Sequence, residues 1–173
     1  DLDATLRAAF EFDEPACVIV KHMNPCGAAT HESGISEAFK LALSADPVSA
    51  YGGILAFNRP LEAEDVRNVF RARTFFEVLA APGFSEEALT ILAKREKLRV
   101  LELPSDWGKS RPSGTDARRI QGGWLLQDWD LGVDFEWNVA TKRQPTEKEA
   151  AALRFTWAAC RNVKSNAIAL GCA

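Results

Sequence analysis

The chain has 173 residues, of which 47% are hydrophobic and 26% charged, and this composition is typical of a folded domain and excludes disordered and collagen-like chains. Lysine and arginine number 21 against 24 aspartate and glutamate, so a net charge of -3 does not supply the basic surface that nucleic acid requires. No apolar stretch approaches the roughly 20 residues that span a bilayer, and the acidic start at Asp1 does not resemble a signal peptide, so we expect a cytoplasmic protein. The four cysteines form no C-x-x-C pair, so we expect reduced thiols.

The hydrophobic pattern of the first hundred residues alternates between helical and strand periodicity. Pro15 ends the first helix, and the β-branched run that follows it is typical of a strand covered on both faces. Such alternation predicts an α/β protein, a three-layer α/β/α sandwich. We expect helices over residues 1–12, 33–45, 62–73 and 85–94, and strands over 16–20, 52–57, 75–80 and 99–103.

The remaining residues are expected to continue the same domain, because neither an internal repeat nor a linker divides the chain. The strand expected at the end of the chain should pair beyond Ala173, in a longer polypeptide, because an unpaired strand edge is a liability. We expect a loop over 104–116, strands over 118–127 and 133–139, a helix over 146–160 and a last strand over 166–172.

Lys21 and His22 follow directly on the strand over 16–20, at the end where open α/β sheets place their ligands. Successive strand residues point to opposite faces, so both side chains reach one site only if the backbone turns, and the residues 24–27 (NPCG) have turn chemistry. An ammonium group beside an imidazole supplies an electrostatic donor and a base, which suits acyl or formyl transfer. The alternative is a solvated lysine next to a structural histidine.

Three further positions could carry chemistry, and each also has a structural explanation. Gly52 and Gly53 precede a strand, where they let a ligand approach the backbone and leave N–H groups free to donate, or else form a bulge or tight corner. Asn166 could orient a carbonyl group, although Ser-Asn is also common where helices end. Glu77 lies in an apolar strand, so it is either an edge residue in water or a carboxylate that needs a partner.

Four sequence blocks occur in the order of a known enzyme family. They are 18–27 (VIVKHMNPCG), 46–59 (DPVSAYGGILAFNR), 139–145 (VATKRQP) and 163–168 (VKSNAI). Together they resemble the transformylase domain of the bifunctional AICAR transformylase/IMP cyclohydrolase family along essentially the whole chain. The resemblance favours the chemical interpretation of Lys21 and His22 over the structural one.

The resemblance implies transfer of a formyl group from 10-formyltetrahydrofolate to the 5-amine of AICAR in purine biosynthesis, on a cytidine deaminase-like fold without zinc. Lys21 and His22 would correspond to the family's catalytic Lys-His pair and Asn166 to its catalytic asparagine. The implied substrate-binding positions are Tyr51, Gly52, Gly53 and Glu77.

The implied roles follow the chemistry of that reaction. His22 is the base, directly or through the carboxamide of the substrate. Lys21 stabilises the tetrahedral oxyanion or protonates the departing folate nitrogen, and Asn166 donates to the formyl oxygen. Active sites of this family form at a dimer interface, so the resemblance implies a homodimer of the complete enzyme, and it leaves open whether a monovalent cation binds.

Several parts of the family's pattern have no counterpart in residues 1–173. These are the cyclohydrolase domain, an Arg-Tyr-Gly segment that binds substrate, and a glycine-rich hairpin and a Phe-Phe-Pro-Phe segment expected after the last residue. We therefore expect a central part of the transformylase domain with weak or no turnover on its own. The alternative is a catalytically silent structural or dimerisation fragment.

A zinc deaminase is a third interpretation, and it fails on ligand spacing. Those enzymes carry H-x-E and P-C-x-x-C. Here Pro25-Cys26 is followed by Ala29 where the second cysteine is needed, and His31 stands directly before an acid without the intervening residue. Three protein ligands are not available at this turn, so we expect no zinc.

Overall fold

The chain divides into two compact units in the computed structural model. The core unit comprises Asp1–Ser105 and Pro145–Ala173, and the hairpin unit comprises Asp106–Gln144. The sequence pattern contains no linker at either boundary. The residues that the structure describes are 1–108, 113–131 and 136–172.

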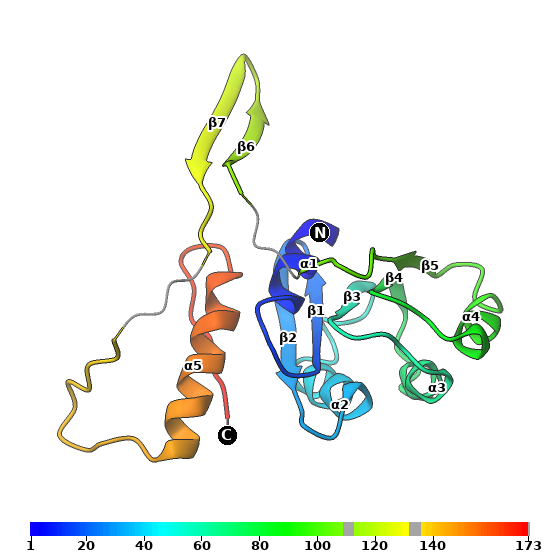
Figure 1. Cartoon of the computed structure of the whole chain (residues 1–173), viewed down its shortest axis with the longest axis horizontal. Helices are drawn as coiled ribbons and strands as arrows, with labels where there is room; N and C mark the ends of the chain where they lie inside the picture. The colour runs from blue at the N-terminus through cyan, green and yellow to red at the C-terminus, as the bar shows by residue number, and fades with distance from the viewer. Residues whose placement is uncertain (109–112, 132–135, 173) are drawn as a thin grey trace. The chain divides into compact units, whose positions relative to one another are not determined.

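The core unit is built on a five-stranded sheet in the order β2-β1-β3-β4-β5 (Figure 1). The inner strand β1 pairs antiparallel with β2 and β3, whereas β3, β4 and β5 run parallel to one another. The first five residues of β1 are fully buried, as the continuous apolar run predicts. The strands are β1 (Ala16–Lys21), β2 (Asn24–Thr30), β3 (Gly53–Phe57), β4 (Phe76–Ala81) and β5 (Arg99–Glu102).

Helices cover both faces of this sheet, because alternate residues of each strand enter different apolar clusters. One cluster joins Ile19 and Leu55 to α2, α3 and α4. The other joins Val18 and Ala56 to α1, with Phe155 of α5 packed against it. An α/β protein is therefore confirmed. The helices are α1 (Leu2–Ala9), α2 (Ile35–Ala45), α3 (Ala63–Arg71), α4 (Glu86–Leu92) and α5 (Glu147–Arg161), close to the expected ranges.

The turn expected at residues 24–27 is wrong, because these residues begin strand β2. The chain reverses instead at His22 and Met23, whose φ angles of 54° and 67° are both left-handed. Positive φ at both residues of a two-residue loop is the geometry of a type I′ hairpin. Pro25 is tolerated because β2 is the edge strand of the sheet. This extra strand is why β1 and β3 are antiparallel rather than a parallel β-α-β pair.

The hairpin unit contains β6 (Thr115–Ile120) and β7 (Gly123–Asp128), paired antiparallel. The single strand expected over 118–127 is therefore wrong, because the chain turns at Gln121 and Gly122, where Gly122 has a φ of 85°. Of the strand expected over 133–139, residues 133–135 lie outside the described residues and 136–139 form no regular structure.

Residues 166–172, which were expected to pair with a strand beyond Ala173, have no regular backbone pairing within the described chain. The alternating apolar side chains Ile168 and Leu170 are 91% and 97% exposed. An alternating pattern forms a strand only when a partner strand and an apolar surface are present. Among the described helices, none combines the length and the apolar character needed to cross a membrane.

Candidate active site

Most of the positions that the sequence singles out lie at one end of the core sheet, where β1 ends and β3 and β4 begin. Because β1 runs antiparallel to β3 and β3 runs parallel to β4, the carboxyl end of β1 lies beside the amino ends of β3 and β4. Lys21 ends β1, Gly53 begins β3 and Glu77 is the second residue of β4. The parallel strands β3 and β4 begin at this end of the sheet and β1 runs against them, so the expectation that Lys21 and His22 follow the carboxyl-end rule of parallel strands is wrong. We call this end of the strands the candidate edge. It is distinct from the two outer edges of the sheet, which are formed by β2 and β5.

Lys21 points across the candidate edge to the turn that precedes β3. Its Nζ donates a hydrogen bond of 2.7 Å to the carbonyl oxygen of Tyr51. Tyr51 itself is 60% exposed, and its ring lies 5.7 Å from the ring of Phe75, which precedes β4. The structure therefore brings the ammonium group of Lys21 to the Tyr51–Gly53 turn, 30 residues away in the sequence.

The two glycines of this turn do not offer free N–H groups, contrary to the expectation. The Gly52 N–H donates to the Phe75 carbonyl at 2.7 Å, and the Gly53 N–H donates to the Ala50 carbonyl at 3.0 Å. Gly52 has a φ of 76°, and a Cβ on Gly53 would stand only 3.0 Å from the Ala50 carbonyl oxygen. The positive φ of Gly52 favours glycine, and a Cβ on Gly53 would crowd the neighbouring backbone, as the tight-corner explanation predicts.

His22 occupies the first position of the type I′ turn, where it is exposed to solvent. Its backbone carbonyl accepts a hydrogen bond of 3.3 Å from Nδ2 of Asn24. Within the described residues, its imidazole has no hydrogen-bond partner. Lys21 and His22 are thus neighbours at the candidate edge, but Lys21 is engaged with the Tyr51 turn while His22 faces solvent.

The segment that follows α5 reaches the same region at Lys164, two residues before Asn166. The backbone N–H of Lys164 donates to Oδ1 of Asn24 at 3.1 Å, which joins residues 140 positions apart in the sequence. Asn166 follows two residues later and is exposed. The Asn24 side chain therefore bonds to both the His22 turn and the Lys164 segment, a role that the sequence analysis missed. The residue type itself indicated such a role, because asparagine side chains often bond to nearby backbone in turns.

Glu77 occupies an irregularity of the sheet. The register between β3 and β4 shifts after Gly53, which leaves Glu77 as the extra residue of a β-bulge. Its side chain is 56% exposed, and its carboxylate lies 3.9 Å from the guanidinium of Arg99 on β5. Since β4 is an inner strand, Glu77 is not an edge residue, and it reaches water because the bulge turns it out of the sheet.

A second bulge lies at the same edge, in β2. The register between β1 and β2 shifts after Ile19, and Cys26 is the extra residue. Burial raises the pKa of the Cys26 thiol, and the negative charge of Asp46 adds to that effect. The thiol therefore stays protonated at neutral pH and is no ready nucleophile. Bulges often lie next to active sites, where they redirect side chains.

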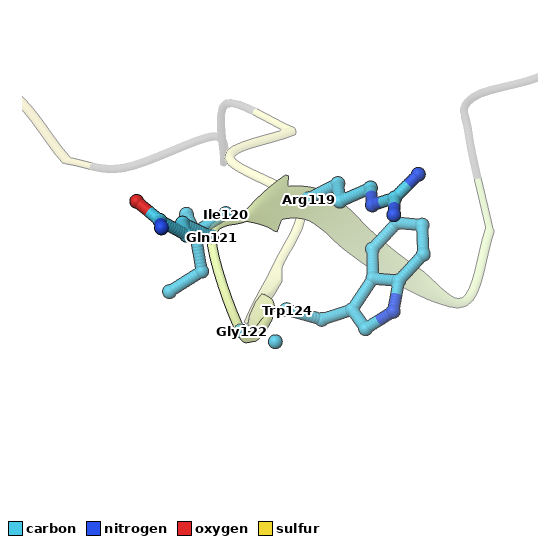
Figure 2. Close-up of a pocket in the computed structure, with 6 residues that line it drawn as sticks. Arg119, Ile120, Gln121, Gly122 and Trp124 are labelled. Carbon is cyan, nitrogen blue, oxygen red and sulfur yellow. The ribbon is translucent and has the colours of Figure 1, made fainter.

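The candidate edge thus offers an ammonium, an imidazole and a carboxylate, a set suited to proton transfer and to stabilising developing negative charge, and the exposed amide of Asn166 follows two residues after the Lys164 contact. Across the parts of the chain that the structure describes, no three His, Cys, Asp or Glu side chains gather as metal ligands. A pocket at the tip of the β6–β7 hairpin contains none of these residues. Figure 2 shows Arg119 beside Trp124 there, its cross-strand partner.

A family comparison extends over both units of the chain. The model of the family described as AICARFT/IMPCHase bienzyme matches residues 1–172. This range includes the four sequence blocks and every residue of the candidate edge. The match is to an enzyme family of purine biosynthesis. On the strength of a match over nearly its whole length, the chain belongs to the AICARFT/IMPCHase bienzyme family.

Proposed function

We propose that this chain supplies part of the active site that transfers a formyl group from 10-formyltetrahydrofolate to the 5-amine of AICAR, on a cytidine deaminase-like fold. One observation carries the proposal. The bonds from Lys21 to Tyr51 and from Lys164 to Asn24 gather the ends of three separate sequence blocks at the candidate edge. The family unites two activities, and these blocks support the formyl transfer because they resemble its transformylase domain.

The proposed reaction begins with attack of the AICAR amine on the formyl carbon. A carbon–nitrogen bond forms, and the carbonyl oxygen gains a negative charge that Lys21 and the Asn166 amide stabilise. The amine loses a proton to His22, directly or through the neighbouring carboxamide. The bond from the formyl carbon to the folate nitrogen then breaks, and that nitrogen takes up a proton, from Lys21 in our assignment.

Positioning is a large part of the work in this proposal, because the AICAR amine is a weak nucleophile whose lone pair is delocalised into the ring. Tyr51 and Glu77 are exposed beside the Lys21 turn and would contact the substrate. His22 and Asn166 are exposed as well. This openness supports a site that a second copy of the chain completes, and hence a homodimer of the complete enzyme.

The test is a formyl-transfer assay with AICAR and 10-formyltetrahydrofolate on the natural full-length polypeptide that carries this chain. General acid–base catalysis contributes about 100- to 10,000-fold to a rate, and we expect His22→Ala to lower kcat by a factor in that range. Removal of an oxyanion donor costs about 100- to 1,000-fold, which is our expectation for Lys21→Ala. Lys40→Ala, at an exposed lysine of α2, is the matched control and should retain full activity.

Thermal unfolding of each variant separates catalysis from folding. We expect the melting temperatures of His22→Ala and Lys40→Ala to match that of the parent protein. If His22→Ala retained formyl transfer, the proposal would fail. If activity fell only in proportion to the folded fraction, the catalytically silent structural role would be correct instead.

A further inference from the structure

The core unit contains a cavity of about 560 Å³ that none of the proposed catalytic residues lines. It lies between the sheet and two connections, the one from α3 to β4 and the one from α4 to β5. Its inner wall is apolar and includes the buried side chains Leu55, Phe76 and Leu79. Small-molecule sites are usually cavities of this size with apolar walls and a few polar groups.

The outer wall of the cavity is strongly basic. Arg73, Lys94, Arg95 and Lys97 line it against the single carboxylate of Glu96, an excess of three positive charges. Within the described part of the chain, no ion pair engages any of these five residues. Their charge is therefore available to a ligand.

The negative carboxyl ends of two helices neutralise part of this positive charge. α3 ends at Arg71 and α4 at Leu92, so both carboxyl termini face this wall, and basic residues are favoured there. Each helix terminus contributes about half a negative charge. Two termini therefore offset about one of the three excess charges, and the cavity keeps a positive field.

An aromatic ring stands next to the charged groups. The guanidinium carbon of Arg95 lies 4.4 Å from the ring centroid of Phe70, and both residues line the cavity. Phe75 lines it as well, and its carbonyl oxygen accepts a hydrogen bond from the Gly52 N–H at the candidate edge. The cavity thus combines apolar and aromatic surface with cations along one wall.

We propose that this cavity binds a small organic anion, in which a carboxylate or phosphate group is attached to an apolar, preferably aromatic, body. The apolar body would lie against Leu55 and Phe76, and the anionic group would face Arg73 and Lys94. The cavity contains none of Lys21, His22 and Asn166, and it adjoins the candidate edge at Phe75, whose ring lies 5.7 Å from that of Tyr51. The volume of about 560 Å³, within the range of small-molecule sites, favours a small molecule over a macromolecular partner.

The test is a titration of the full chain followed by ¹⁵N–¹H NMR. The probes are phenyl phosphate and 4-phenylbutyrate, with inorganic phosphate and phenol as the anionic and apolar parts alone. We expect either amphipathic anion to shift the amide signals of 73–76 and 94–98 in a saturable way. Inorganic phosphate and phenol should each bind at least tenfold more weakly, and the two amphipathic probes together show which anionic group is preferred.

Variants of exposed residues test the charge. An exposed ion pair is worth about 0.2–1 kcal/mol, so Arg73→Gln and Lys94→Gln should each weaken phenyl phosphate binding by up to about fivefold. Lys148→Gln, on the exposed surface of α5, removes the same charge elsewhere and should not change the Kd. His22→Ala should also leave the Kd unchanged, which separates this site from the proposed active site. Unsaturable or scattered shifts, or equal binding by the Lys94→Gln and Lys148→Gln variants, would overturn the proposal.

Discussion

Replacing Asn58 by alanine removes a buried amide that follows β3 and bonds to three backbone groups between the end of α1 and the start of β1. Asn58 is only 4% exposed. Its Nδ2 donates to the carbonyls of Phe12 and Glu14, each at 2.8 Å, and its Oδ1 accepts the N–H of Ala16 at 2.8 Å. One side chain thus fixes the connection from α1 to β1 against the neighbouring strand.

The cost of the substitution follows from these three bonds. A hydrogen bond contributes about 1 kcal/mol net, and partners left buried without one cost at least as much. We therefore expect Asn58→Ala to lower the free energy of unfolding by about 3 kcal/mol. For a chain of this size, 1 kcal/mol corresponds to about 2–4 °C, so the melting temperature should fall by about 6–12 °C.

Urea unfolding followed by circular dichroism measures this change directly. Asn138→Ala, at an exposed asparagine of the hairpin unit, is the matched control and should unfold like the parent protein. Asn58→Asp retains the acceptor for Ala16 but places a carboxylate beside two carbonyls, so it should destabilise at least as much. An Asn58→Ala variant within about 1 kcal/mol of the parent would refute the hydrogen-bond reasoning.

Three further substitutions or reactions probe other contacts. Thr146→Ala removes the side chain of a capping box at the start of α5 and should cost about 1 kcal/mol, measured as a lower melting temperature. Asn24→Ala removes the acceptor of the Lys164 N–H, so hydrogen exchange at that amide should accelerate, and an unchanged rate would contradict the bond. Burial raises the pKa of the Cys17 thiol and shields it from reagents, whereas the Cys172 thiol is exposed. With a thiol reagent at pH 8, Cys172 should react in the native protein and Cys17 only after unfolding.

Local sequence patterns were sufficient to predict the helices and strands whose buried faces follow from their own hydrophobic periodicity. The run from Ala16 to Val20 forms the buried inner strand β1, and the four helices of the first hundred residues occur within a few residues of their expected ranges. Gly27 was misread as a turn residue. A Cβ there would stand 1.9 Å from the Ala42 carbonyl oxygen, so glycine is required where β2 packs against α2. That requirement depends on tertiary contact, which no local pattern contains.

The candidate site was predictable in its residues but not in its geometry. The sequence indicates Lys21, His22 and Asn166 as polar groups at the ends of elements. The contacts that gather them depend on the antiparallel pairing of β1 and β3 and on the bond between Asn24 and Lys164, both formed over long sequence separations. The exposure of Glu77 depends on a bulge, whose position is set by strand register.

The two outer strands of the core sheet, β2 and β5, are poorly suited to pairing with strands of other polypeptides. On one side, β2 carries Pro25, which has no N–H to donate, and a bulge at Cys26 that interrupts the strand. On the other side, β5 has only four residues and begins with the charged Arg99. Short, charged or interrupted borders resist the addition of a foreign strand. The core unit is thereby protected from growing into a larger sheet by pairing with a strand of another chain.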